Sequence, residues 1–335
     1  MDTIRIGFIG CGNIAHSHAL RMSQLEGVEI VALADPGERG RQLLKQKFGL
    51  EQAAEFDSHT DMLASDTMDA VIICSPHTLH ARHAEEALMA GKHVLIEKPM
   101  TCSSEEAKRL MSAAERSGKK LQVSFQRHFL PPFLYIRSAI ADGVIGKLTS
   151  VTATLLQDWK DAQKGTWRQM PELSGGGMLM DSGSHIIDVL LWTTGLTPQH
   201  VAVQLECHGS PVEVDTFTSI RFAEGAIGSM NIVGLVPLAK LKETYAFIGE
   251  AGAIFYDNGR ITLQLNGQEP VEPKLPEAVT DPDRSFIDAI RGKHEVLVPA
   301  EYALKVVTFT ETIYAAAGYE VVPAKQPDVA GGRVS

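Results

Sequence analysis

Residues 10–15 read Gly-Cys-Gly-Asn-Ile-Ala and stand between an apolar run, Ile4–Gly10, and a helical pattern, Ile14–Leu25. This is the G-x-G-x-x-G/A pattern that joins the first strand and helix of a dinucleotide-binding unit. Gly10 allows a tight turn, and Gly12 has no side chain to keep a pyrophosphate away from the backbone. The segment therefore predicts an α/β fold whose first turn binds a nucleotide.

Other residues of this unit complete the expected cofactor site. The small Ala15 lets the helix pack closely on the strand, and the free N–H groups at the helix start attract an anion. Asp35 ends the second strand, where an acid accepts the ribose 2′-OH of NAD and repels the 2′-phosphate of NADP. NAD is therefore expected, with NADP as an alternative because Arg39 is close in the sequence. A glycine turn that binds no nucleotide is the alternative to this cofactor site. The cofactor-binding residues predicted here are Gly10, Cys11, Gly12, Asn13, Ile14 and Asp35.

Strands and helices alternate through the first part of the chain. The strand-like runs are apolar almost throughout, which is typical of parallel strands covered by helices on both faces. We therefore expect a Rossmann dinucleotide-binding domain over residues 1–125. Its predicted strands are Ile4–Gly10, Val28–Asp35, Ala70–Ser75, His93–Glu97 and Leu121–Phe125, and its predicted helices are Ile14–Leu25, Glu38–Phe48, Thr78–Ala90 and Ser103–Ser117.

Beyond residue 125 strands follow one another without alternating helices. This pattern predicts an α+β domain over residues 126–335 with a large, mostly antiparallel sheet. The predicted strands are Leu148–Leu156, Val201–Cys207, Thr216–Phe222, Ala226–Val233, Thr244–Gly249, Ala253–Tyr256 and Ile261–Leu265, and the predicted helices are Phe133–Asp142, Met178–Thr194 and Tyr302–Ala317.

Composition excludes several classes of function. The 335 residues include 31 Lys and Arg against 41 Asp and Glu, a net charge of −10, which disfavours nucleic acid as a partner. No apolar run reaches the ~18–20 residues that span a bilayer, and the first residues do not resemble a signal peptide, so a cytoplasmic protein without membrane contact is expected. Four dispersed cysteines (Cys11, Cys74, Cys102 and Cys207) are expected to be buried thiols, with no metal site.

Glu97-Lys98-Pro99 ends one of the predicted parallel strands. Open α/β sheets bind ligands at the carboxyl ends of their strands, so an acid and a base at this point are candidates for a functional site. The alternative is a surface salt bridge. His16, His18, His83 and His93 have no such context and are expected to be ordinary helix or strand-end residues.

Asp181, His185 and Asp188 are spaced i, i+4 and i+7. In a helix this spacing places two carboxylates and an imidazole on one face. An imidazole whose tautomer is fixed by a carboxylate is a competent general base for removing a hydroxyl proton, with an ionisation near the ordinary histidine range. A structural Asp–His pair is the alternative.

Three segments of the chain resemble the Gfo/Idh/MocA family of oxidoreductases. They are residues 10–15, residues 90–99 (AGKHVLIEKP) and residues 175–188 (GGGMLMDSGSHIID), and a similar segment, residues 286–292 (FIDAIRG), recurs near the family's C-terminal end. The resemblance implies that residues 75–80 lie along the nicotinamide half of the cofactor, with His77 where the family usually has Asn. It also implies cofactor contacts for Ser75, Pro76, His77, His80, Glu97, Lys98, Gln126, Trp167 and Arg168.

The resemblance implies an NAD(P)-dependent dehydrogenase that acts on a secondary alcohol of a sugar, cyclitol or related polyol. Lys98, Asp181 and His185 would be its catalytic residues, and either Lys98 or His185 could be the base. Two alternatives use the same scaffold: a redox-neutral enzyme with tightly held NAD, and a nucleotide-sensing protein without catalysis. A homodimer or homotetramer, formed through the C-terminal sheet, is also expected.

Overall fold

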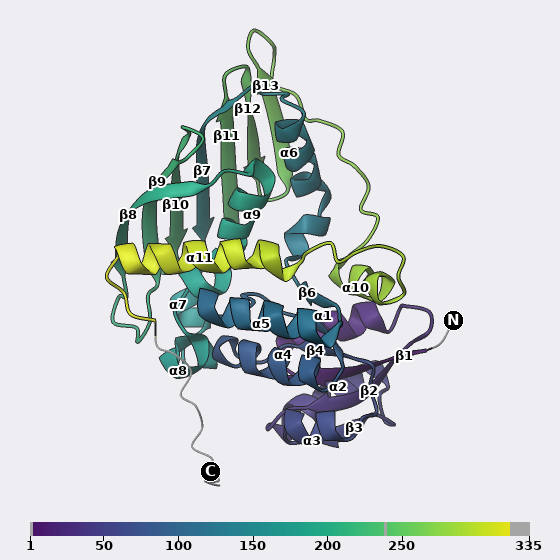
Figure 1. Cartoon of the computed structure of the whole chain (residues 1–335). Helices are drawn as coiled ribbons and strands as arrows, with labels where there is room; N and C mark the ends of the chain where they lie inside the picture. Colours follow the sequence, from purple (N-terminus) through teal and green to yellow (C-terminus); the bar gives the residue numbers. More distant parts are fainter. Residues whose placement is uncertain (1–2, 238–239, 322–335) are drawn as a thin grey trace.

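The computed structural model describes residues 3–237 and 240–321. Figure 1 shows two sheets, each with its own helices, and the long helix α11 (Ala300–Ala316) crossing the molecule between them. The N-terminal sheet occupies the lower part of this view and the C-terminal sheet the upper part.

The N-terminal sheet is a Rossmann sheet, as predicted. Its six parallel strands lie in the order β3-β2-β1-β4-β5-β6, so the strand order reverses between β1 and β4. Ligands bind such sheets at this reversal, outside the carboxyl ends of the strands. The strands are β1 (Ile4–Ile9), β2 (Val28–Ala34), β3 (Ala54–Phe56), β4 (Ala70–Ile73), β5 (His93–Ile96) and β6 (Leu121–Val123).

The helices between these strands differ from the predicted ones mainly at their ends. The first ends at Met22 rather than Leu25, and the predicted helix Thr78–Ala90 begins as a short 3₁₀ turn. The short β3 and α3 were not predicted, because elements of three and six residues give little periodicity. The helices are α1 (Asn13–Met22), α2 (Glu38–Phe48), α3 (His59–Ala64), η1 (His77–Leu79), α4 (His80–Met89) and α5 (Ser104–Ser117).

The C-terminal sheet has seven strands in the order β13-β12-β11-β7-β10-β9-β8. Only the β7–β10 pair is parallel, so the prediction of a mostly antiparallel sheet is confirmed. Each predicted strand is present, with ends shifted by up to three residues. The strands are β7 (Leu148–Leu156), β8 (Pro198–Glu206), β9 (Asp215–Phe222), β10 (Ile227–Val233), β11 (Lys242–Gly249), β12 (Gly252–Asp257) and β13 (Arg260–Leu265).

Three helices, α6 (Pro131–Ala141), α9 (Ser184–Thr194) and α11, lie on one face of this sheet (Figure 1). The predicted helix Met178–Thr194 is not uniform, because a π-helical turn, η4 (Leu179–Gly183), precedes α9 (Ser184–Thr194). Helix α10 (Pro282–Ile290) was not predicted, although its residues were part of the family resemblance. The remaining elements are η2 (Gln126–Phe129), α6 (Pro131–Ala141), α7 (Trp159–Ala162), η3 (Trp167–Gln169) and α8 (Pro171–Ser174).

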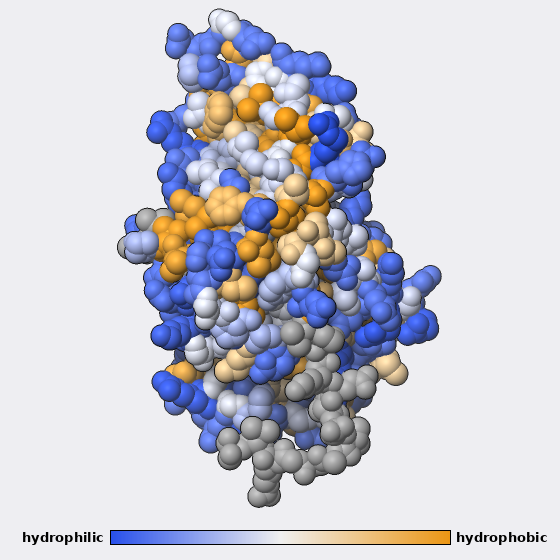
Figure 2. Space-filling view, turned by 90° about the vertical axis from the view of Figure 1, so that its left-hand side faces the viewer, coloured by the Kyte–Doolittle hydropathy of each residue, from blue (hydrophilic) through white to orange (hydrophobic). Residues whose placement is uncertain are grey.

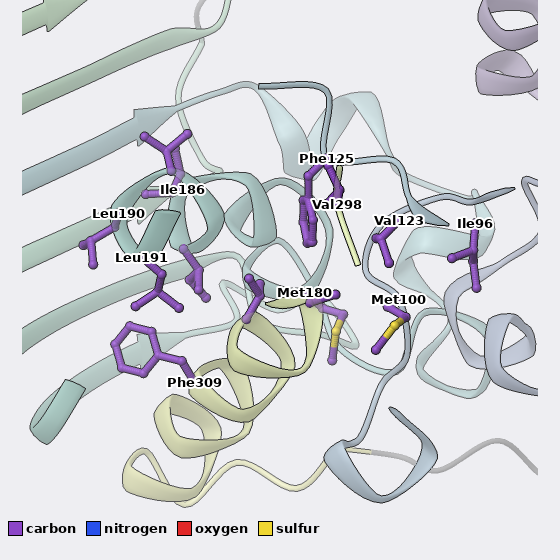
Figure 3. Packing of buried hydrophobic residues seen from close by; sticks show 14 of the residues in the cluster. Ile96, Met100, Val123, Phe125, Met180, Ile186, Leu190, Leu191, Val298 and Phe309 are labelled. Atoms are coloured by element: carbon purple, nitrogen blue, oxygen red, sulfur yellow. The ribbon is translucent and has the colours of Figure 1, made fainter. Parts of the chain in front are cut away.

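Two clusters of buried side chains hold these layers together. The larger cluster runs from the N-terminal sheet into α9 and α11, and Figure 3 shows Ile96 and Val123 in the same packed layer as Met180 and Phe309. The smaller cluster lies on the other side of the N-terminal sheet. It contains Phe286 and Ile287 of α10 beside the apolar residues of α1. A late helix therefore completes the core that forms around α1.

Membrane-spanning helices, metal-binding clusters and disulfides are absent among the described residues. No described helix is long and apolar enough to cross a membrane. No group of three or more His, Cys, Asp or Glu side chains among the described residues is placed to hold a metal ion. All four cysteines are free thiols. Cys11 and Cys102 are buried as expected, but Cys74 and Cys207 are partly exposed, which corrects the prediction for these two.

Candidate functional site

A cleft of about 560 Å³ lies where the carboxyl ends of the N-terminal strands face the second half of the chain. Gly12 and Asn13 form part of its wall at the start of α1, and Asp181 and His185 form part from η4 and α9. Four of the predicted site residues, Gly10, Cys11, Asp35 and Pro76, do not line the cleft. The cleft is lined by all the others, which are Gly12, Asn13, Ile14, Ser75, His77, His80, Glu97, Lys98, Gln126, Trp167, Arg168, Asp181 and His185.

The glycine turn has the shape that a pyrophosphate needs. Gly10 has φ +92°, and a Cβ there would lie 2.7 Å from the backbone of Cys74, so the close approach of β1 and β4 requires glycine. A Cβ on Gly12 would meet nothing within 4 Å, because this position opens into the cleft. Helix α1 has no side-chain cap, so the N–H groups of its first turn are available to an anion. These residues fit the diphosphate of NAD.

Asp35 stands at the end of β2 with its carboxylate fixed by the backbone. Its Oδ2 accepts the N–H of Cys11 at 2.7 Å, and its Oδ1 accepts the N–H of Gly37 at 2.7 Å. These bonds tie the end of β2 to the glycine turn. Asp35 is therefore held beside the turn, as the proposed contact with the adenosine ribose requires, although outside the cleft itself.

Asp181 is the centre of the charged groups in the cleft. Lys98 Nζ lies 3.1 Å from its carbonyl oxygen and 3.3 Å from Oδ1, while Trp159 Nε1 and Arg168 Nε donate to Oδ2 at 2.9 and 3.0 Å. His77 Nε2 lies 3.7 Å from Oδ1. Burial would raise the pKa of Asp181, but the charges of Lys98 and Arg168 hold this pKa well below its usual range. The carboxylate is therefore ionised and cannot act as an acid.

His185 is partly exposed in the wall of the cleft, and the structure corrects its predicted ionisation. Burial, with smaller effects of Arg127 and Lys98, lowers its pKa well below the ordinary histidine value. Its Nδ1 has no hydrogen-bond partner among the described residues. The ring is therefore neutral at physiological pH and can accept a proton.

Asp188 does not join Asp181 and His185 as the spacing predicted. Its Oδ1 faces His128 Nε2 at 2.7 Å and accepts the hydroxyl of Tyr302 at 2.8 Å. In the described part of the chain no hydrogen bond links His185 to either carboxylate. For Asp181 the reason is the π-helical turn, which displaces it from the α-helical position assumed in the i, i+4 argument. Asp188 lies in the regular helix α9, and His128 and Tyr302 hold it instead.

A buried acid anchors the glycine segment that leads into this turn. Glu213 Oε1 accepts the N–H of Leu179 at 3.0 Å and the hydroxyl of Tyr314 at 2.8 Å, and its Oε2 accepts the N–H of Gly177. A Cβ on Gly177 would lie 1.9 Å from the carbonyl oxygen of Glu213. Only glycine therefore fits, which gives a packing reason for the Gly175–Gly177 run.

The loop after β4 is held by histidines. His77 Nδ1 donates to the carbonyl of Ser174 at 3.1 Å, and burial lowers the pKa of His77 to about 3, so the ring is neutral. The two nitrogens of His80 lie 2.7 and 2.8 Å from the carbonyls of Pro99 and Ser75. These contacts join the loop to Pro99, whose peptide bond with Lys98 is cis.

Sequence reasoning missed several residues of the cleft and one behind it. Trp159, behind the cleft, is fully buried and donates to Asp181, yet nothing in the pattern after β7 distinguishes it from a core residue. Most of the missed residues that line the cleft are polar and come from the connections between β7 and α9, where no periodicity places them. They are Gln157, Gln163, Thr166 and Ser182, and Cys74 at the end of β4 also lines the cleft.

Comparison with protein families gives two matches. Residues 4–125 match the model described as "Oxidoreductase family, NAD-binding Rossmann fold", and residues 133–255 match the "GFO/IDH/MocA C-terminal domain".

Comparison with individual proteins agrees with these matches. The chain is 27% identical to D-glucoside 3-dehydrogenase of Escherichia coli K12, covering 94% of this chain and 95% of that protein. It is 31% identical to oxidoreductase P35 of Formosa agariphila, covering 83% and 88%. Among solved structures, the WlbA dehydrogenase of Bordetella pertussis in complex with NADH and UDP-GlcNAcA has a TM-score of 0.82 and 27% identity, covering 95% and 96%.

The position of Asp35 leads to a prediction on cofactor choice. Asp35→Ser removes both the repulsion of a 2′-phosphate and the acceptor for the ribose 2′-OH. The ratio of kcat/KM with NADP to that with NAD should rise about tenfold or more, which corresponds to a change on the order of 1.4 kcal/mol. Steady-state kinetics with both cofactors measure this ratio. The control is Glu38→Ser, because Glu38 is an exposed acid at the start of α2. An unchanged ratio in Asp35→Ser would show that the carboxylate does not face the ribose.

Proposed function

Since the chain belongs to the Gfo/Idh/MocA family of oxidoreductases and carries its NAD-binding Rossmann domain, we propose that it oxidises a secondary alcohol of a sugar, cyclitol or related polyol. One observation carries this proposal: Lys98, Asp181 and His185 line the same cleft as the glycine turn. The two relatives and the solved structure described above include two named dehydrogenases, one of a glucoside.

The polar character of the cleft fits a polyol. Gln126, Gln157, Gln163, Thr166 and Ser182 offer hydroxyl and amide groups on the second-domain side. Such groups recognise the alternating donors and acceptors of sugar hydroxyls. NAD, when bound at the glycine turn, supplies the hydride acceptor.

Lys98 and His185 have different roles toward the alcohol group of the substrate. The Lys98 ammonium is held by Asp181 at the edge of the cleft, where it can donate a hydrogen bond to the substrate oxygen and stabilise negative charge on it. His185 is neutral and can take the hydroxyl proton on Nε2. Arg168 and Trp159 keep Asp181 ionised and fixed, so Asp181 orients Lys98 rather than exchanging a proton itself.

A panel of sugars, cyclitols and polyols with NAD, followed at 340 nm, tests the proposed function. Lys98→Met and His185→Asn should each lower kcat at least about a hundredfold, within the range for loss of a positioned acid–base group. NADH affinity, measured by titration calorimetry, should stay within several-fold in both variants, because neither side chain forms the glycine turn. Failure of the wild-type protein to bind NADH would refute the dehydrogenase function, and turnover without added NAD would indicate the redox-neutral alternative.

The lowered pKa of His185 leads to a pH prediction. A base must be unprotonated to act, so lowering its pKa moves the rising limb of kcat/KM to lower pH. Alcohol oxidation should therefore show its rising limb below pH 6.5, and this limb should be absent in His185→Asn. Profiles measured from pH 5 to pH 9 decide the point. A limb that persists in His185→Asn and is lost only in Lys98 variants would make Lys98 the base.

We also propose that the chain forms a homodimer or homotetramer through the uncovered face of the C-terminal sheet. Helices cover only one face of this sheet, and Phe217 and Phe255 point from the other face, 47% and 40% exposed. Apolar groups that remain exposed on a sheet face favour association. The cytoplasmic location expected from the sequence stays a prediction.

Light scattering after size exclusion tests this assembly. The wild-type protein should elute as a dimer or tetramer, and Phe217→Asp with Phe255→Asp should elute as a smaller species, because the charges would be buried at the interface. Val279→Asp, at a position 83% exposed outside the sheet, should leave the mass unchanged. A wild-type monomer would exclude the proposal.

A further inference from the structure

His18 lies in the middle of α1, beneath the cleft, with both ring nitrogens against carboxylates. Nε2 lies 2.9 Å from Oε1 of Glu97, and Nδ1 lies 2.7 Å from Oδ1 of Asp283. The ring is completely buried. A neutral imidazole has one N–H to donate, and ionised carboxylates only accept hydrogen bonds. Two contacts of this kind therefore need the imidazolium form.

The surrounding charges support this form. Burial alone would lower the pKa of His18, but the charges and hydrogen bonds of Asp283 and Glu97 raise it to about 9. Burial would likewise raise the pKa of Glu97, which His18 and, less strongly, Lys98 lower to about 2. Arg21 of α1 also bonds Asp283. Two cations, His18 and Arg21, thus face two anions.

Two further titratable groups adjoin this cluster. The carboxylate of Asp281 lies 3.8 Å from Nε of Arg21. The thiol of Cys74, at the end of β4, has its pKa raised by burial and then by Glu97 and Asp283. It is therefore a neutral neighbour and does not compete with His18 for the carboxylates. The pairing of His18 with Glu97 and Asp283 thus rests on their charges and hydrogen bonds.

Glu97 connects this cluster to the reaction site. Its Oε2 accepts the backbone N–H of Lys98 at 3.2 Å, and it lines the cleft beside the Lys98 side chain. Lys98 Nζ is directed to Asp181 instead. The charge of Lys98 also lowers the pKa of Glu97, so the ammonium interacts with both carboxylates although it contacts only Asp181. A buried carboxylate without a partner attracts a cation strongly. What keeps Glu97 from competing is that His18 already pairs with it.

We propose that His18, as an imidazolium, is a positioning residue that neutralises Glu97 so that Lys98 stays on Asp181 and faces the substrate. The proposal rests on the function proposed above for Lys98. His18 acts through Glu97 and touches no reacting atom.

A purely structural role is the competing explanation. Asp283 is in the first turn of α10, whose Phe286 and Ile287 pack in the same core as α1, so His18 also fastens the late helix to the early one. A fastening role uses the Asp283 side of the ring, whereas the positioning role uses the Glu97 side. Variants of the two carboxylates therefore separate the explanations.

The experiment compares His18→Gln, Glu97→Gln, the double variant His18→Gln/Glu97→Gln and, as a matched control, His18→Gln/Asp283→Asn. His18→Gln should lower kcat at least tenfold while the Kd for NADH stays within threefold. The Glu97→Gln change should restore a part of kcat in the His18→Gln background, since it removes the competing charge, and Asp283→Asn should restore none. The proposal would be overturned if the losses of kcat in His18→Gln and Glu97→Gln simply multiply in His18→Gln/Glu97→Gln. It would also be overturned if Asp283→Asn restores kcat in the His18→Gln background and Glu97→Gln does not.

Two readouts need no turnover, so they keep this proposal separate from the proposed function and from misfolding. In a crystal structure of His18→Gln without substrate, Lys98 Nζ should contact Glu97 rather than Asp181, and an unmoved Lys98 would overturn the proposal. In the wild-type protein, the NMR signals of the His18 ring should show the imidazolium at pH 8. A neutral ring at that pH would also overturn it, even if His18→Gln does not fold.

Discussion

A buried carboxylate must have partners, and the partners of Asp181 determine how the cleft is built. Lys98 reaches it from the N-terminal sheet, while Trp159 and Arg168 reach it from the connections of the second half. An ionised group taken out of water without such contacts would cost several kcal/mol. The ion pair that keeps Asp181 stable is therefore also the contact that joins Lys98 of the Rossmann half to the second half of the chain across the cleft.

The cores of the two halves support this arrangement. The larger apolar cluster is continuous from the strand ends of the N-terminal sheet to α9 and α11 (Figure 3), and α10 returns to close the smaller one. Some hydrophobic residues remain at the surface. Figure 2 shows them gathered at mid-height on the side of the molecule where β8 forms the edge of the C-terminal sheet. A continuous core transmits displacement from one half to the other, because close-packed interiors deform little. Lys98 and Asp181 therefore keep their positions relative to each other.

The sequence predicted the parts of the fold that local patterns encode. Apolar runs and helical periodicity predicted both sheets, and the glycine turn with Glu97-Lys98-Pro99 predicted the sheet edge at which the cleft lies. Sequence patterns fail where contacts between distant segments determine the position of a side chain. The π-helical turn breaks the i, i+4 geometry of Asp181 and His185, and Asp188 bonds His128 and Tyr302 from distant segments. Trp159 and Glu213 likewise gain their roles from partners that lie 22 to 101 positions away.

Two histidines show why spacing cannot assign chemistry. His18 is completely buried and His185 is partly exposed in the wall of the cleft, and desolvation alone lowers the pKa of both. His18 lies between the carboxylates of Glu97 and Asp283, which more than offset this effect and keep its proton. His185 has the cations Arg127 and Lys98 near it, which add to the effect and remove the proton. Only the second is available to accept a proton, and only the first can neutralise a buried acid, so the charge of the neighbours assigns the role of each ring.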